Sequence, residues 1–213
     1  MSAQCSRLHR LVLQAKLFAF PFDDRSIPAN GIYVLFETGE EAHGGRRIVR
    51  IGTHTGDNQL RSRLNQHFVM ENKDRSIFRK NIGRALLQKA NDPFLKWWDV
   101  DLTTSEAKRR YARKIDFAKL RGIEAAVTRY IQKHISFMVF QVDDKETRLD
   151  LESKMISTVS LCKVCGPSGR WLGLHSPKAK IRDSGLWLVN QLQREPLGEE
   201  DFRKLERFVD WTI

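Results

Sequence analysis

The clearest succession of apolar and polar stretches in the chain lies between residues 31 and 52. An apolar run rich in β-branched and aromatic residues covers 32–36, the polar stretch TGEEAHGG follows it, and a second, mainly apolar run covers 48–51. Residues of the first kind favour extended backbone, and glycines favour a turn. The pattern therefore predicts a β-hairpin.

The segment that follows the hairpin predicts a helix. The stretch THTGDN contains residue types that cap helices, and apolar side chains then recur every four residues at Leu60, Leu64 and Phe68. Arg63 and His67 are also four residues apart. On a helix, side chains at this spacing reach the same small volume.

Helical spacing recurs elsewhere, and one more strand is indicated. The expected helices cover 6–18, 77–90, 104–134, 149–161 and 198–213, and the expected buried strand covers 135–142. We expect Gly122 to divide the long charged segment into two helices. The segment RWLGLHS is expected to be extended, and the C-terminal helix to dock through apolar side chains that include Trp211.

The balance of charges indicates a polyanionic partner. The 213 residues include 37 Lys and Arg against 26 Asp and Glu, which gives a net charge of +11 and a pI of about 9.8. Nucleic acid fits this excess better than a membrane, since no stretch approaches the roughly 20 apolar residues of a spanning helix. A basic surface that serves only solubility is the alternative.

Three cysteines are too few and too unevenly spaced for a secreted disulfide framework. The N-terminal segment also lacks the apolar run of a signal peptide, so we expect a cytoplasmic protein. Cys162 and Cys165 form a C-x-x-C pair, and His175 follows them. A structural zinc ion needs about four ligands, and this segment offers only three obvious ones. The sequence therefore favours buried, reduced thiols over a zinc site.

Three short motifs follow one another in order: the tripeptide GIY at 31–33, the tripeptide RIG at 50–52, and Arg63 with His67. Together they resemble the core of the GIY-YIG nuclease family, metal-dependent enzymes that cut phosphodiester bonds in DNA. The first tripeptide matches the family motif letter for letter. The second departs from it, because Arg50 stands where the family usually has a tyrosine.

The resemblance implies an α/β (α+β) fold in which a small mixed or antiparallel sheet, with the hairpin at its core, is flanked by helices. Compact relatives carry their last catalytic residue much closer to the hairpin. We therefore expect a single elaborated domain over 1–213. Its parts would be a core at 28–70 and 135–175, a helical insertion at about 71–134, and a C-terminal helical part at 176–213.

The resemblance also implies roles for the matched residues. Tyr33 would lie beside the attacking water as general base, and Arg50 would supply the positive field that favours loss of the phenolic proton. Arg63 would clamp the scissile phosphate through its planar fork of donors. His67, neutral near physiological pH, would pass on a proton or orient the phosphate. His54 is a less specific neighbour that suits a turn equally well.

The family carries its metal on one glutamate of a later helix, and Glu152 matches that position. Glu146 is the competing choice, in an expected turn, and an ordinary surface glutamate near a helix start is the structural alternative. One carboxylate suits one hard divalent ion, Mg2+ or another such as Mn2+, completed by waters and phosphate oxygens. Many relatives also use a later asparagine, a role left here to Ser168, to the distant Asn190 or to no residue.

Several cations near the predicted site are candidates for contacts with the DNA backbone: Arg61, Arg79, Lys80 and Arg84. The alternative for each is an ordinary solvated helix face. The neighbouring Trp97 and Trp98 are expected in the core rather than as platforms for base stacking.

Two other functions compete with DNA cleavage. A catalytically inactive DNA- or RNA-binding protein on the same scaffold explains the charge and Arg50 equally well, but it leaves the joint presence of Tyr33, Arg63, His67 and Glu152 poorly explained. A structural protein that owes its charge to solubility predicts no salt-dependent affinity for nucleic acid. The expected partner is duplex DNA, and symmetric cutting would favour a homodimer.

Overall fold

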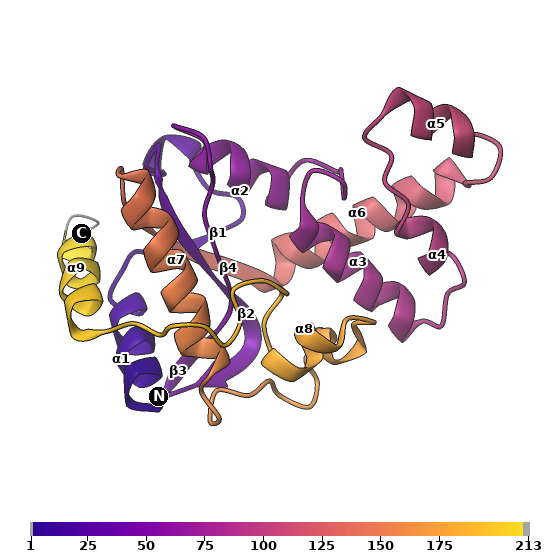
Figure 1. Cartoon of the computed structure of the whole chain (residues 1–213). Coiled ribbons are helices and arrows are strands. Elements are labelled where there is room, and N and C mark those ends of the chain that lie inside the picture. Colours follow the sequence, from indigo (N-terminus) through magenta and orange to yellow (C-terminus); the bar gives the residue numbers. More distant parts are fainter. Residues whose placement is uncertain (1, 211–213) are drawn as a thin grey trace.

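The strands form one antiparallel sheet. The computed structural model describes residues 2–210, and within them four strands pair in the order β1-β4-β2-β3. These strands are β1 (Phe18–Ala19), β2 (Gly31–Ala42), β3 (Gly45–Gly52) and β4 (Ile135–Gln141). Helices lie on both sides of the sheet (Figure 1). The expected fold class, an antiparallel sheet with a hairpin core flanked by helices, is confirmed.

The helices lie before, between and after these strands along the chain. They are α1 (Ser2–Val12), η1 (Asp24–Ser26), α2 (Leu60–Phe68), α3 (Ile77–Lys89), α4 (Leu95–Trp98), α5 (Ser105–Tyr111), α6 (Phe117–His134), α7 (Lys145–Ser160), η2 (Leu172–His175), α8 (Ala179–Ser184) and α9 (Glu199–Asp210), where η marks a 3-10 helix. Within residues 2–210, no helix combines the length and the apolar character needed to cross a membrane.

The hairpin is longer than the sequence pattern indicates. Strand β2 continues through the polar stretch, so the turn shrinks to His43 and Gly44, which have φ angles of 54° and 79°. Positive φ at both central positions matches the twist of paired strands. In the resulting register Tyr33 lies opposite Gly52, and Leu35 lies opposite Arg50.

Both faces of the sheet are buried, which explains the continuous apolar run of β2. Successive residues of a strand point to opposite faces. Ile32 and Val34 belong to the apolar cluster that includes residues of α1, α7 and α9, whereas Tyr33 and Leu35 belong to the cluster formed with α2, α3 and α6. The hairpin is thus the central layer of the molecule.

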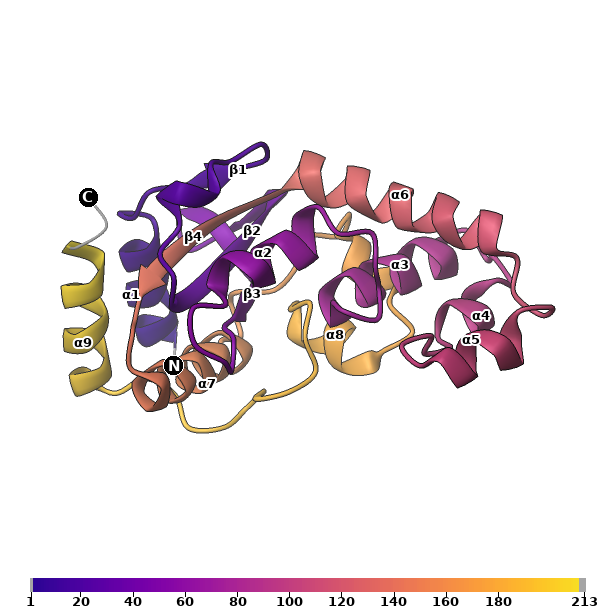
Figure 2. The same ribbon diagram turned by 90° about the horizontal axis from the view of Figure 1, so that it is seen from above.

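Helices α3, α4, α5 and α6 lie together beyond one end of the sheet (Figure 2). Trp98 of α4 is completely buried against Gly83 of α3, as expected for a core tryptophan. The expected break at Gly122 is wrong, because the chain breaks instead before α6, where the Asp116 side chain accepts a hydrogen bond from the backbone of Lys119. A glycine inside a helix costs only about 1 kcal/mol, and packing along α6 offsets this.

Three other local expectations differ from the structure. Helix α1 ends at Val12, and Phe18 instead pairs with Phe137 in the sheet. The segment expected to turn before α7 is its first turn, because Asp144 caps it. The 170–176 segment contains η2 rather than extended backbone. Trp211, expected to help dock the C-terminal helix, lies outside the described residues.

Candidate active site

Tyr33 and His67 are joined by a hydrogen bond in the interior. The Tyr33 hydroxyl lies 2.8 Å from Nε2 of His67, and Nδ1 of His67 lies 2.7 Å from Oγ of Ser76. All three side chains are completely buried. Phenol, imidazole and hydroxyl therefore form one chain of hydrogen bonds, along which a proton can move away from Tyr33.

The hairpin register explains why a glycine ends the second tripeptide. A Cβ added at Gly52 would lie 2.3 Å from the hydroxyl oxygen of Tyr33, its partner across the two strands. Glycine within a strand allows such a close approach, which any other side chain would block. Gly52 therefore makes room for the phenol that bonds to His67.

His67 is held in its neutral form. Burial lowers its pKa well below the ordinary value, and the positive charges of Arg63, Arg50 and Arg79 lower it further. A neutral imidazole has one nitrogen free to accept a proton or a hydrogen bond. The environment of His67 thus leaves one ring nitrogen able to accept the hydrogen bond of Tyr33, while the lowered pKa makes the ring a weak base.

Glu152 is close to two of the same cations. Burial raises the pKa of its carboxyl, while Arg50, the backbone N–H of Thr53 and Arg63 lower it. Arg50 and Arg63 therefore act on both His67 and Glu152. Because charge interactions weaken with distance, Arg50 and Arg63 lie near both side chains.

Arg50 is a buried cation with hydrogen-bonding capacity to spare. One terminal nitrogen donates to the backbone carbonyl of Trp187, and its guanidinium carbon lies 5.4 Å from the centre of the Phe78 ring. Its Nε is buried and has no hydrogen-bond partner among the described residues. A buried donor of this kind favours a nearby anion.

Arg63 lines an open cavity of about 500 Å3 at the end of the hairpin. One of its terminal nitrogens donates to the Gln66 side chain and to the Arg75 carbonyl, both at 3.0 Å. The lining groups are hydroxyls, amides, an imidazole and guanidiniums, from Thr53, His54, Thr55, Gln59, Ser62, Arg63, Gln66 and Arg75. Their donors suit a phosphate.

His54 contributes to the shape of this cavity rather than to its reactivity. Its Nδ1 lies 2.6 Å from the carbonyl of Gly56, and its Nε2 accepts from the backbone N–H of Gly31 at 3.3 Å. Desolvation by burial lowers the pKa of His54, so the neutral form that makes both bonds is favoured. Both ring nitrogens are thus used by the loop.

Sequence reasoning missed two residues of this region, Ser76 and Arg148. Ser76 caps α3 and positions His67 from the next helix. Arg148 lies one turn before Glu152 on α7, is completely buried, and lowers the pKa of that carboxyl. Its spacing of four residues from Glu152 is the signal that could have indicated it.

Arg79, expected to contact DNA, lies in the interior. Its side chain is completely buried and forms an ion pair with Glu124 of α6, with an N–O distance of 2.9 Å. Another of its nitrogens donates to the backbone carbonyl of His67 at 3.1 Å. The periodicity of α3 predicts one buried face, but the structure covers the helix on several sides. Arg79 therefore holds the helices together, and we do not include it among DNA contacts.

The other three cations also bond within the protein. Lys80 pairs with Asp74 at 3.1 Å, and Arg84 pairs with Asp99 at 2.6 Å. Arg61 belongs to an exposed position of α2, and its Nε donates to a backbone carbonyl at 2.7 Å. Of these three, Arg61 is the residue whose exposure leaves donors available for a phosphate.

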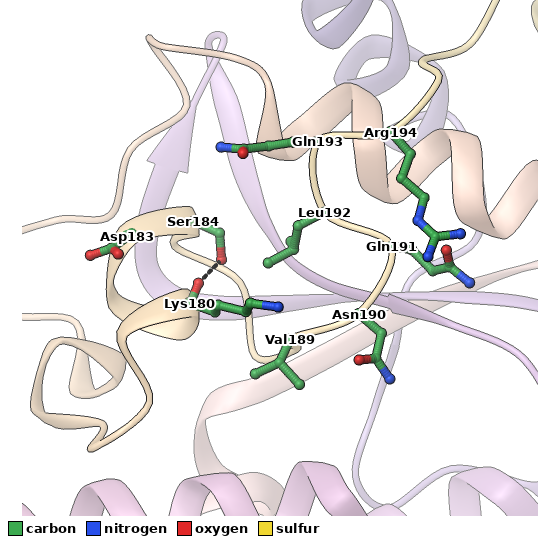
Figure 3. Close-up of a pocket in the computed structure, with 9 residues that line it drawn as sticks. All are labelled: Lys180, Asp183, Ser184, Val189, Asn190, Gln191, Leu192, Gln193 and Arg194. Atoms are coloured by element: carbon green, nitrogen blue, oxygen red, sulfur yellow. Dashed lines mark hydrogen bonds between the residues drawn. The ribbon is translucent and has the colours of Figure 1, made fainter.

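The candidates for the family's asparagine lie elsewhere. Asn190 lines a separate cavity of about 570 Å3 between α8 and segment 189–194 (Figure 3). Ser168 donates a hydrogen bond to the carboxylate of Glu40. Neither Asn190 nor Ser168 lines the cavity that contains Arg63.

The carboxylate of Glu152 is a ligand of the kind that a hard divalent cation takes. Burial disfavours the ionised carboxyl, and a bound cation would reverse that preference. Mg2+ binds through one or two carboxylates and keeps several waters or phosphate oxygens, so a single protein carboxylate is sufficient. Glu152 accepts from the backbone N–H of Thr53, a residue that lines the open cavity.

The hairpin, the helix with Arg63 and His67, and the later helix with Glu152 occur in the order that the sequence motifs indicate. The family model described as the GIY-YIG domain matches residues 4–212. The chain belongs to the GIY-YIG nuclease family. Nucleases of this family act on nucleic acid and generally use divalent metals. Comparisons with curated proteins and with solved structures find no match.

Proposed function

We propose that this chain is an endonuclease that hydrolyses phosphodiester bonds in duplex DNA, with one divalent cation, Mg2+ or Mn2+, bound at Glu152. The observation that carries the proposal is the buried hydrogen bond, 2.8 Å long, between the Tyr33 hydroxyl and Nε2 of His67. Arg50 and Arg63 act on both His67 and Glu152. A proton acceptor, phosphate-binding cations and a metal ligand are the groups that this reaction needs.

Tyr33 and His67 would take the proton of the attacking water. As the water oxygen forms its bond to phosphorus, its proton passes to the Tyr33 oxygen, and the phenolic proton passes to Nε2 of His67. The 2.8 Å hydrogen bond supports this route. The negative charge of the bound phosphate would offset the arginine charges that lower the pKa of His67 in the free protein. The bond from phosphorus to the leaving oxygen breaks in the same displacement.

Arg63 and Arg50 would stabilise the charge that gathers on the phosphoryl oxygens. Arg63 lines the cavity, where its planar guanidinium can meet two oxygens at once. Arg50 has a buried Nε without a protein partner among the described residues, which favours an anion nearby. A cation bound at Glu152 would act as a Lewis acid on the same oxygens and on the leaving oxygen.

The expected partner is duplex DNA, and the expected compartment is the cytoplasm. Arg75, which lines the cavity, and Arg61, on the same helix as Arg63, are both exposed, and we propose that they contact the DNA backbone. Cutting both strands of a duplex would require two such sites, which favours a homodimer on DNA. The three cysteines are free thiols, which fits the cytoplasm.

One observation favours a second function. Tyr33 is completely buried, and Arg50, which replaces the usual tyrosine, already donates to Trp187. A chain with these features could bind DNA or RNA on the same scaffold without cutting it. Such a protein would show salt-dependent affinity but no strand scission with any divalent metal.

Supercoiled plasmid incubated with the purified chain tests the proposal. With Mg2+ or Mn2+, the wild-type protein is expected to produce nicked and linear forms, and EDTA is expected to prevent both. Arg63→Ala is expected to remove cleavage. Arg25→Ala is the matched control, because the Arg25 side chain is 94% exposed on η1, away from the cavity. Tight binding without scission across DNA substrates and metals would replace this proposal by the second function.

A further inference from the structure

A cluster of cysteine and histidine side chains lies apart from the candidate active site. The cluster consists of Cys5, His9, His43 and Cys165. Each offers one ligand atom, and these four atoms all lie within 4.8 Å of one another. Cys5 and His9 have no exposed surface, and Cys165 is 3% exposed. Sulfur and imidazole donors gathered in the interior are the ligands that zinc prefers.

The spacing inside the cluster agrees with a tetrahedral metal site. Zn–S and Zn–N bonds of about 2.3 and 2.0 Å at a tetrahedral angle place sulfur and nitrogen about 3.5 Å apart. The Sγ of Cys165 lies 3.6 Å from Nε2 of His9. The rings of His9 and His43 are neighbours, with centroids 4.8 Å apart. Cys165 and His9 therefore already stand at the spacing that a shared tetrahedral ion requires.

The orientation of His9 also suits a metal ligand. Its Nδ1 lies 2.9 Å from the backbone carbonyl of Cys5, so that nitrogen donates its proton, and Nε2 carries the lone pair. Nε2 accepts a long hydrogen bond, 3.3 Å, from the backbone N–H of Ile48, and the Sγ of Cys165 is its other partner. Zinc-binding histidines commonly donate their other N–H to a carbonyl in this way.

His43 lies at a strained position that a ligand role would explain. It has a φ of 54°, a value at which glycine or asparagine is usual, and Gly44 completes the turn. In this conformation the His43 ring reaches the cluster, and its Nε2 lies 3.5 Å from the Sγ of Cys162. Cys162 is thus a neighbour of the cluster, whereas His175 is exposed on η2.

We propose that Cys5, His9, His43 and Cys165 bind one structural Zn2+ ion. The ion would tie α1 to the β2–β3 turn and to the segment after α7, elements that lie together at one side of the molecule (Figure 1). His43 lies at the opposite end of the hairpin from Tyr33, roughly 30 Å along a strand that rises about 3.3 Å per residue. The zinc site is therefore separate from the cation proposed at Glu152.

Metal analysis of the full-length protein tests this site without any nuclease assay. The chain is purified under reducing conditions without chelator, supplied with ZnSO4 and desalted. We expect about one zinc per chain, and with Co2+ in its place the intense visible absorption and thiolate charge-transfer bands of tetrahedral coordination. A stoichiometry near zero, or octahedral Co2+ spectra, would overturn the proposal. A Cys5–Cys165 disulfide in protein kept reduced would also overturn it.

Variants identify the ligands. Cys5→Ser, His9→Ala and Cys165→Ser are each expected to lose tightly bound zinc, and the control His175→Ala is expected to keep it. Zinc retained by the first three, or lost from His175→Ala alone, contradicts the assignment. Because ligand variants can also unfold, removal of zinc from the wild type with a strong chelator provides a second measurement. It is expected to lower the Tm, and re-addition of zinc is expected to restore it.

Discussion

The hydroxyl of Tyr33 lies 2.8 Å from Nε2 of His67, although the two residues come from a strand and from the helix that follows the hairpin. Both side chains are completely buried, so this bond is made in a medium where electrostatic interactions are strong. It joins the first family motif to the third. The proposed proton route depends on this pair.

Tyr33→Phe tests the route directly. The variant keeps the ring but removes the hydroxyl, so cleavage is expected to fall by about 10²-fold or more, the usual contribution of a general base. The stability cost is expected to be about 1 kcal/mol, since one buried partner is lost. Tyr130→Phe is the matched control, because its hydroxyl bonds to Glu37 instead. Equal losses of cleavage in both variants would contradict the role of Tyr33.

His67 predicts a pH dependence of stability. Its folded-state pKa is lowered well below 6.5, so above about pH 6.5 both folded and unfolded states are neutral. Below that pH His67 binds a proton in the unfolded state but not in the folded state, and the free energy of unfolding falls. The slope can reach about 1.4 kcal/mol per pH unit. Denaturant titrations from about pH 7.5 to 5.5 measure it.

The matched variants separate His67 from the other histidines. His67→Gln is expected to weaken the slope, and exposed His175→Gln is expected to leave it unchanged. His54, whose pKa is also lowered by burial, acts in the same direction, so part of the slope persists. A slope unaffected by His67→Gln would show that His67 is not held neutral by the fold.

Glu152→Gln is expected to separate activity from stability. Burial raises the pKa of this carboxyl despite the neighbouring arginines, so the ionised form is less favourable in the folded than in the unfolded chain. Removing the charge should therefore leave the Tm equal or higher, while metal-dependent cleavage is lost. Glu146→Gln, at an exposed position of the same helix, is the control and should still cut. Cleavage retained by Glu152→Gln would remove Glu152 from the site.

Arg79 is expected to matter for stability and not for DNA binding. Arg79→Ala leaves Glu124 buried without its partner and should cost about 3–5 kcal/mol. Arg79→Leu combined with Glu124→Leu should recover much of that loss, because no charge is then left unpaired. Urea titrations measure the stability of both variants. A reduced salt dependence of DNA affinity in the double variant would instead indicate a phosphate contact.

Gly52→Ala tests the space beside Tyr33. The added methyl would meet the Tyr33 hydroxyl at 2.3 Å, so the ring must move and its bond to His67 must lengthen. Cleavage is expected to fall strongly, with a destabilisation of about 1–3 kcal/mol typical of overpacking. Gly122→Ala is the control, since a methyl there meets no atom within 4 Å. That variant should be as stable as the wild type or more so.

The sequence by itself determined the elements whose signals are local. Alternation of apolar runs and turn residues predicted the hairpin, and the four-residue spacing predicted α2 with Arg63 and His67 on neighbouring positions. The resemblance to the family then indicated Glu152 on a helix more than 80 residues later. These features were accessible because each motif lies within one strand or one helix.

Only the tertiary structure decided which cationic side chains are exposed and which cysteine and histidine side chains lie together. The periodicity of α3 could not show that Arg79 faces Glu124, because the partner lies 45 residues away. The pattern after α7 offered Cys162, Cys165 and His175, whereas the cluster draws Cys5 and His9 from the first helix and His43 from a turn. Such groupings depend on long-range packing, which brings separate segments together and which no local spacing encodes.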